Sequence, residues 1–338
     1  MFVANSASGG GAELASRILC AKLNSPEFPC SYVAINDWPD DGVVFTSDLI
    51  RIGRRYKGNI INLGISALKF YLVVRKRKPD ILVLNCELPE LFSLIAPSSC
   101  KRIVVEHTSK PWIRLRLLGF IVRRRLTHLQ TTWVTVSKDG EIWGVHSVRP
   151  IHIPNLIVHD LAKLDGRLTR IQRLFFVGRL NSIKQPSFIL KASQASGIPA
   201  ILIGDGPEFK TLEKQIFEKS LDVTLHGHSS RPWDQLRLGD LVIVPSLYEG
   251  DGLVVSEAIM MGAPLLLLDT PDLRKFNLPD KSYFLDSQEL IHKIEHFENI
   301  PLEILPSPEI LHAQIKERSP NFILDCWKLL FESLSKAP

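Results

Sequence analysis

Short apolar or β-branched runs alternate along the chain with longer stretches in which apolar residues recur every three or four positions. The short runs predict buried parallel strands at residues 81–84, 102–105, 133–136, 174–177, 200–203, 223–225, 241–244 and 264–268. The longer stretches predict helices at residues 11–23, 63–77, 186–195, 207–218, 253–261 and 322–334. Strands that alternate with helices favour an α/β protein whose parallel sheets are covered by helices on both faces.

The alternation of strands and helices stops and then starts again, which indicates two domains. A polar stretch at residues 155–173 separates the two series. We expect Rossmann-like, doubly wound domains at residues 1–157 and 158–318, followed by an amphipathic C-terminal helix within residues 319–338. Ligands of open α/β sheets lie beyond the carboxyl ends of the strands, so two such domains that face each other would hold a ligand in the cleft between them.

Composition narrows the class of protein. Of the 338 residues, 45% are apolar and 23% are charged, as in folded soluble proteins. No apolar run reaches the length of about 18 residues that a membrane-spanning helix needs, and residues 1–11 lack the basic and apolar regions of a secretory leader. The five cysteines are scattered and form no C-x-x-C pair, as expected for reduced thiols. We therefore expect a cytoplasmic protein.

The net charge of +5 is divided unequally between the two halves. Residues 1–155 carry 21 Lys and Arg against 12 Asp and Glu, whereas the remainder carries 20 against 24. A basic half predicts contact with nucleic acid, an anionic membrane surface or a phosphorylated substrate. The segment 110–129 holds six basic residues and no acidic one: Lys110, Arg114, Arg116, Arg123, Arg124 and Arg125. It fits a basic amphipathic helix on the cytoplasmic face of a membrane, with a solvated helix face equally favoured; RNA binding has no recognised motif here.

The strongest local signal is a glycine-containing turn at residues 245–252, between a predicted strand and a predicted helix. Two glycines let backbone N–H groups approach an anion, and the helix N-terminus adds partial positive charge. A phosphate could lie above Gly252, Leu253 and Val254, and Gly250 and Asp251 are further residues of the expected donor site. Glu249 and Glu257, eight positions apart, could accept hydrogen bonds from sugar hydroxyls. A capping turn with a solvated glutamate explains the spacing equally well.

Two cations follow the strand at residues 174–177. Arg179 can grip two phosphate oxygens and Lys184 adds a point charge, so together they could neutralise a diphosphate without a metal ion; two exposed loop cations are the simpler alternative. Gly204 lies in a further strand-to-helix turn, and His226 follows the next strand, where it could line a pocket for a nucleotide base. We found no D-x-D or C-x-x-C pattern, so no metal site is expected.

The first half offers weaker signals. Gly10 and Gly11 end a triple glycine before a predicted helix, which would let the helix N-terminus approach a ligand. His107 follows the strand at residues 102–105, where it could make a polar contact or act in general acid or base catalysis. A structural histidine is about as well supported by the sequence. Residues 1–4 leave room for only a short first strand.

Together these residues resemble the retaining glycosyltransferases of family 4, which have the GT-B fold. The resemblance extends from the glycines near residue 9 to about residue 270. The family's E-x7-E element matches Glu249 to Glu257, and its G-R-L-x-x-x-K element matches residues 178–184. The G-D-G-P turn matches residues 204–207. The chain departs from the family at Asp251, where an aromatic residue is usual; an anion beside a diphosphate is unfavourable unless it turns away or binds a sugar hydroxyl, which leaves the donor sugar open.

The resemblance implies a role for each matching residue. Arg179 and Lys184 would hold the donor diphosphate, and Glu249 would contact the transferred sugar. Glu257 would bind the ribose, the neighbourhood of His226 would face the base, and His107 would lie near the transferred sugar. No cofactor or metal is implied, the first domain would bind the acceptor, and the last helix would return to it.

The resemblance thus implies retaining transfer of a sugar from a nucleotide diphosphate, UDP more often than GDP, to a glycan or lipid-linked acceptor in cell-surface polysaccharide or glycolipid synthesis. A nucleotide-sugar epimerase or a phosphorylase on the same scaffold would convert the donor without an acceptor or release sugar with phosphate. A non-catalytic nucleotide-sugar-binding protein would bind UDP without turnover. Nucleic acid is the least favoured partner.

Overall fold

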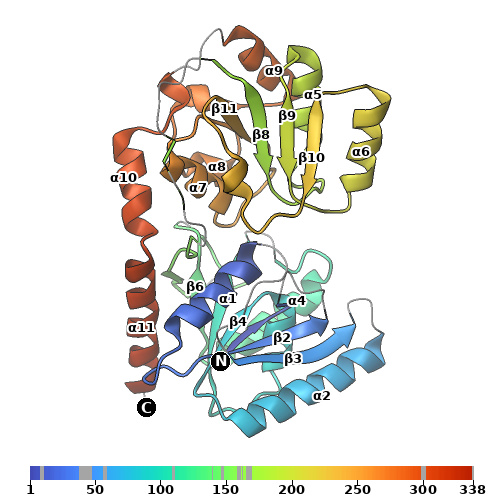
Figure 1. The fold of residues 1–338 in the computed structure, drawn as a ribbon. Helices are drawn as coiled ribbons and strands as arrows, with labels where there is room; N and C mark the ends of the chain where they lie inside the picture. The colour runs from blue at the N-terminus through green and yellow to red at the C-terminus, as the bar shows by residue number, and fades with distance from the viewer. Residues whose placement is uncertain are drawn as a thin grey trace. The chain divides into compact units, whose positions relative to one another are not determined.

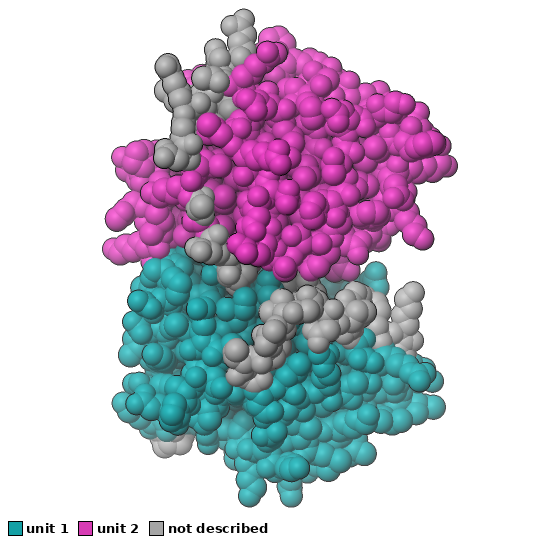
Figure 2. Space-filling model, in the orientation of Figure 1, with its two compact units in different colours: residues 1–158, 317–338 teal, residues 159–316 magenta. Residues whose placement is uncertain are grey.

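A computed structural model describes residues 1–7, 11–37, 48–55, 59–108, 111–138, 140–145, 148–157, 161, 163–164, 170–297 and 302–336. The chain divides into two compact units, coloured separately in Figure 2. Unit 1 comprises Met1–Val158 and Glu317–Pro338, and unit 2 comprises His159–Lys316. These limits fall one residue after and two residues before the expected domain boundaries at 157 and 318. Unit 1 is therefore built from both ends of the chain.

Unit 1 contains a seven-stranded sheet in which every described pair of strands is parallel. The strands, in spatial order, are β3 (Asp48–Arg55), β2 (Ser31–Asp37), β1 (Phe2–Ala4), β4 (Ile81–Asn85), β5 (Lys101–Glu106), β6 (Thr132–Thr135) and β7 (Ile151–His152). The chain builds outward from β1 in one direction and then resumes with β4 on its other side. Such a reversal of strand order marks the place where open α/β sheets bind ligands.

Helices cover both faces of this sheet because successive strand side chains point to opposite sides. Leu82 and Leu84 of β4 pack in one apolar cluster with α2 (Ile60–Arg77), α3 (Glu87–Ser93) and α4 (Arg116–His128). Val83, from the same strand, packs in a second cluster with α1 (Gly11–Leu23) and α11 (Pro320–Lys336). Figure 1 shows α2 running beside β2 and β3. The C-terminal helix thus completes the core of the unit that contains the N-terminus.

Unit 2 contains a six-stranded sheet with the same kind of strand order, again parallel throughout its described pairs. The strands are β10 (Val223–Gly227), β9 (Ala200–Ile203), β8 (Arg173–Val177), β11 (Asp240–Val244), β12 (Leu265–Leu268) and β13 (Tyr283–Phe284). The helices are α5 (Ser187–Ser196), α6 (Phe209–Glu218), α7 (Leu253–Met261), α8 (Pro271–Arg274), α9 (Ser287–His296) and α10 (Pro308–Glu317). Strand order reverses between β8 and β11, so their carboxyl ends define this unit's expected ligand site.

The structure confirms the two doubly wound parallel sheets and the returning C-terminal helix. The helices at residues 11–23 and 253–261 have the predicted limits. Two expectations are wrong in detail. β10 extends to Gly227, so His226 lies in a strand rather than after it. The basic segment 110–129 is helical only from Arg116, Lys110 lies outside the described residues, and Trp112 and Arg123 are buried. No helix in the described part of the chain is long and apolar enough to cross a bilayer.

Candidate functional site

The turn between β11 and α7 has the geometry of an anion-binding helix start. Gly252 is the N-cap of α7 and has a φ angle of 68°, in the left-handed region. A Cβ atom there would lie 2.7 Å from Cζ of Phe276, so the position requires glycine for both its backbone conformation and its packing. The first N–H groups of α7, at Leu253 and Val254, have no partner within the helix and are suited to a phosphate oxygen.

Lys184 and Glu249 form an ion pair between the loop after β8 and the turn after β11. Both side chains are largely enclosed, with 24% and 10% of their surface exposed. The two loops are also joined through the backbone, since the Leu247 N–H donates to the Ile183 carbonyl at 2.9 Å. The structure therefore brings together a predicted phosphate-binding cation and a predicted sugar-binding carboxylate at the place where strand order reverses.

Two residues that follow β12 support this turn, and sequence reasoning missed both. The Glu249 N–H donates to Oδ2 of Asp272 at 3.0 Å, and Nζ of Lys275 donates to the Gly250 carbonyl at 2.6 Å. One feature of the sequence could have pointed to Asp272 and Lys275. They follow β12, the strand that pairs with β11, and so lie at the same edge of the sheet as the turn. Lys275 therefore adds a second cation, besides Lys184, that contacts the turn.

Close backbone approach explains the glycine after β9. A Cβ atom on Gly204 would lie 1.9 Å from the Gly178 carbonyl oxygen, and the Gly204 N–H donates to the Gly227 carbonyl at 2.8 Å. Arg179 follows Gly178 and is exposed at this edge, as is His226 in β10. Arg179 and Lys184 thus lie in the same loop after β8, and Arg179 is the more exposed of the two.

Glu257 lies inside α7 and is 4% exposed. Its Oε2 accepts a hydrogen bond of 2.9 Å from Nε1 of Trp233, in a short 3-10 helix spanning Pro232–Gln235. Trp233 stacks on Phe175 of β8, with ring centroids 5.9 Å apart. Trp233 therefore fixes the position of the carboxylate. The sequence pattern did not reveal it because it is far from Glu257 along the chain. Asp251, the departure from the family pattern, is also buried.

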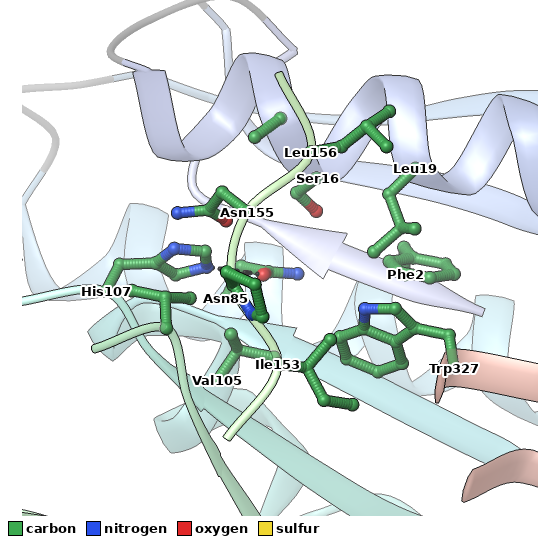
Figure 3. Close-up of a pocket in the computed structure, with 13 residues that line it drawn as sticks. Phe2, Ser16, Leu19, Asn85, Val105, His107, Ile153, Asn155, Leu156 and Trp327 are labelled. Atoms are coloured by element: carbon green, nitrogen blue, oxygen red, sulfur yellow. Dashed lines mark hydrogen bonds between the residues drawn. The ribbon is translucent and has the colours of Figure 1, made fainter. Parts of the chain in front are cut away.

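Unit 1 has a small pocket at the carboxyl ends of β4 and β5, next to α1 (Figure 3). Its polar lining includes His107, Asn85, Asn155 and Ser16, and its apolar lining includes Phe2 and Trp327. Nε2 of His107 lies 2.8 Å from Oδ1 of Asn85, whose Nδ2 donates to the Val3 carbonyl at 3.3 Å. Because the amide nitrogen is committed to a carbonyl, Oδ1 is the acceptor and Nε2 of His107 carries the proton.

Arg123 of α4 joins two buried carboxylates in unit 1 rather than facing outward. Its Nη2 lies 2.7 Å from Oε1 of Glu90 and its Nη1 lies 2.5 Å from Oε2 of Glu106. Burial raises the pKa of Glu90, and it raises that of Glu106 from 4.5 to about 7, although the guanidinium partly opposes both changes. One guanidinium neutralises two buried carboxylates only in part, so the Glu90 and Glu106 pair retains a proton more readily than an exposed glutamate does.

The sequence-predicted residues fall into two groups, one in each unit. Unit 2 holds Arg179, Lys184, Gly204, His226 and the residues of the turn and helix from Glu249 to Glu257. Unit 1 holds His107 and Gly11, the first residue of α1, whereas Gly10 lies outside the described residues. Within the described ranges, no three His, Cys, Asp or Glu side chains cluster as metal ligands would.

Comparison with known proteins finds a family match that covers most of unit 2. Residues 169–318 match the family model for group 1 glycosyl transferases. A putative glycosyltransferase, EpsF, of Bacillus subtilis (strain 168) is 33% identical over 101 residues, which cover 28% of this chain and 26% of that protein. The alpha-D-kanosaminyltransferase of Streptomyces kanamyceticus is 31% identical over 111 residues, or 30% and 29%. The chain therefore matches little more than a quarter of the length of these curated relatives.

Solved structures resemble nearly the whole chain. HepE of Anabaena, crystallised with UDP and glucose, has a TM-score of 0.75 and 17% identity, with 99% of each chain covered. Sucrose-phosphate synthase of Thermosynechococcus elongatus has a TM-score of 0.76 and 15% identity, also with 99% of each chain covered. The fold is the GT-B fold.

Proposed function

We propose that the protein is a hexosyltransferase that moves a sugar from a nucleoside diphosphate sugar to a hydroxyl group of an acceptor. UDP is favoured over GDP as the nucleotide of the donor. The observation that carries this proposal is the Lys184–Glu249 ion pair, which lies beside the glycine-capped start of α7. A diphosphate at the α7 N-terminus would contact the Lys184 ammonium group, which also pairs with Glu249. Glu249 could then accept a hydrogen bond from a sugar hydroxyl. The HepE structure with UDP and glucose supports this choice of ligand.

The chemistry requires stabilisation of the diphosphate as it leaves. Negative charge grows on the leaving phosphate in the transition state, and fixed donors and cations placed there lower the barrier. The groups available in unit 2 are the first N–H groups of α7, Lys184 and Arg179. We propose that they perform this role without a divalent metal, so that turnover persists in EDTA. Glu257, positioned by Trp233, would accept hydrogen bonds from the ribose.

We further propose that transfer occurs with retention at the anomeric carbon and that unit 1 binds the acceptor. The resemblance of residues 178–184 and 249–257 to a retaining family supports the first point. The pocket beside His107 supports the second, because its polar side chains can bind a hydroxyl group. A glycan or lipid-linked acceptor used in cell-surface polysaccharide or glycolipid synthesis fits this assignment. Proton NMR of the product, recorded before anomeric exchange, distinguishes retention from inversion.

Arg179→Ala tests the assignment of the diphosphate site. Loss of one donor to a developing anion costs about 10²-fold or more in turnover, so the variant should lose at least that much activity with the nucleotide sugar that screening identifies. The matched control is Arg237→Ala, another exposed arginine of unit 2 located just before β11. Substrate screening comes first, by thermal shift against nucleotides and nucleotide sugars in EDTA. Near-normal turnover of Arg179→Ala would contradict the assignment, and UDP binding without turnover would favour a binding protein.

A further inference from the structure

Helix α2 of unit 1 is apolar on its outer side as well as its inner side. Ser66, Phe70 and Val74 face the sheet and are buried. On the opposite side, at spacings of four, three and four residues, Ile61, Ile65, Leu68 and Leu72 are 69%, 51%, 58% and 56% exposed. A surface helix ordinarily presents polar side chains outward, and one that is apolar all round lies against another apolar phase. This outer stripe therefore needs a partner.

The segment that leads into α4, and α4 itself, repeat this arrangement. Ile113 and Leu115 are exposed before the helix, and Leu117, Phe120 and Ile121 are 76%, 44% and 56% exposed along it. Nineteen large apolar side chains are exposed among the described residues, and ten of them lie in residues 60–72 and 113–121. Exposed apolar surface is therefore concentrated on these two segments. We call the exposed apolar and basic residues of 60–78 and 113–125 the outer face.

The two segments lie on the same side of unit 1. The inward side chains of α2 and α4 belong to one apolar cluster, which covers a single face of the sheet. Their outward side chains therefore both point away from that face. At 1.5 Å per residue, the 18 residues of α2 alone provide a strip of about 27 Å. The outer face is thus broad enough to contact an extended surface.

Charge identifies the kind of surface. Residues 60–78 and 113–125 contain no Asp or Glu. The exposed cations are Lys69, Arg75, Lys76, Lys78, Arg114, Arg116, Arg124 and Arg125. Arg77 pairs with Asp48 at 2.7 Å and is left out of this set. Cations that border large apolar side chains complement an anionic lipid surface, where the apolar groups enter the acyl boundary and the cations meet phosphates.

We propose that the outer face of unit 1 docks on the surface of an anionic lipid bilayer. The proposal does not depend on the proposed glycosyl transfer. A second copy of this chain is a poorer occupant, because a two-fold contact through the same face would bring the basic clusters of both copies together. The helices would lie along the membrane surface. Docking is weakened by salt, because lipid phosphates and side-chain cations attract across a screened interface.

Vesicle flotation of the full chain tests the proposal. Vesicles of phosphatidylcholine alone are compared with vesicles in which about a third of the lipid is phosphatidylglycerol, at low and high salt. We expect the protein to float with the anionic vesicles at low salt, to dissociate at high salt, and to bind neutral vesicles at least tenfold more weakly. Equal binding to both vesicles, or to neither, would overturn the proposal.

The variant Leu68→Ser/Leu72→Ser removes the centre of the α2 stripe and should reduce binding to anionic vesicles at least tenfold. The matched control is Phe217→Ser in α6 of unit 2, which removes an apolar side chain that is 86% exposed elsewhere. All three residues are exposed, so both variants should fold normally. Wild-type binding by the double variant would contradict docking through this face. Light scattering that finds a wild-type dimer and a variant monomer would instead assign the face to a second copy. Donor turnover with a soluble acceptor should stay unchanged, which separates this test from that of the proposed function.

Discussion

At the scale of single residues, the central feature is the ion pair between Lys184 and Glu249. It brings together a residue predicted to bind phosphate and a residue predicted to bind the sugar. Both groups are largely enclosed, so their attraction is stronger than that of an exposed pair. The pair also offsets the repulsion between the Glu249 carboxylate and an incoming diphosphate. Binding of the nucleotide and contact with the sugar are therefore separable by substitution.

Glu249→Gln should separate them. The amide releases Lys184 and removes a negative charge beside the diphosphate, so affinity for UDP should stay equal or increase. Turnover should fall by about 10²-fold or more if the carboxylate contacts the transferred sugar. Calorimetric titration with UDP and initial rates with the donor measure the two effects, with exposed Glu213→Gln in α6 as the control. A parallel loss of affinity and turnover would show that Glu249 acts chiefly by holding the turn.

At the scale of elements, α4 is tied to β5 and α3 through charge. Arg123 reaches Glu106, the last residue of β5, and Glu90 within α3. Removing one member of such a buried group leaves an uncompensated charge, which costs about 3–5 kcal/mol. The basic segment 110–129 therefore contains arginines with different roles. Arg123 is buried and anchors α4, whereas its neighbours Arg124 and Arg125 are exposed.

Stability should depend on pH through Glu106. Burial raises its pKa to about 7, so between about pH 4.5 and pH 7 the folded state holds a proton that the unfolded state has lost. Its contribution is complete below pH 4.5 and declines as the pH rises through 7, by an amount on the order of 1–3 kcal/mol. Urea unfolding near pH 5 and pH 7.5 should show a smaller decline for Glu106→Gln than for the wild type. Exposed Glu141→Gln should match the wild type, and an equal decline in all three proteins would refute the prediction.

The elements found from sequence share a physical property, which is a strong pattern over several residues. β8, β9, β11 and β12 are buried along most of their length and read as continuous apolar runs. Several of the missed elements lack this pattern, whereas β2 was missed although it is buried from Tyr32 to Asn36. β3 is an edge strand with three arginines and mixed exposure, β7 has two residues, and α3 has seven. Burial of such segments is decided by neighbours that are distant in sequence.

The same reasoning explains which parts of the candidate site were predicted. Lys184, Glu249 and Gly252 were found because they fall in short motifs at strand ends. Asp272, Lys275 and Trp233 were missed because each acts on a site residue across the fold. The burial of Arg123 was also missed, since a cationic stripe does not reveal which of its members meets an internal carboxylate.

At the scale of the whole molecule, the restart of the strand pattern was enough to predict two units, and the isolated helix near the C-terminus was enough to predict a third segment. That α11 packs in unit 1 followed from the family resemblance alone. The structure gives the cause. Ile323, Trp327, Leu330 and Phe331 bury one side of α11 in the cluster that also contains Phe2. The rings of Trp327 and Phe2 lie 6.1 Å apart.

Trp327→Ala should therefore destabilise unit 1 while leaving unit 2 largely unaffected. Removing a buried tryptophan costs about 3–5 kcal/mol. The exposed residue Leu329 on the same helix provides the control, and Leu329→Ala should change stability by less than about 0.5 kcal/mol. Hydrogen exchange should accelerate in β1, β4 and β5 of the first variant and not in β8 or β11. Equal acceleration in both sheets would contradict the assignment of α11 to unit 1.

The return of α11 also governs the order in which the protein can mature on the ribosome. Unit 2 is continuous, so all its residues leave the exit tunnel before the last helix does. Unit 1 begins first, but until α11 has been synthesised Phe2, Val83 and Ile103 are covered only in part, by α1. A nascent chain that stops short of α11 would consequently lose its amino-terminal unit, the part made earliest, and retain the part made later.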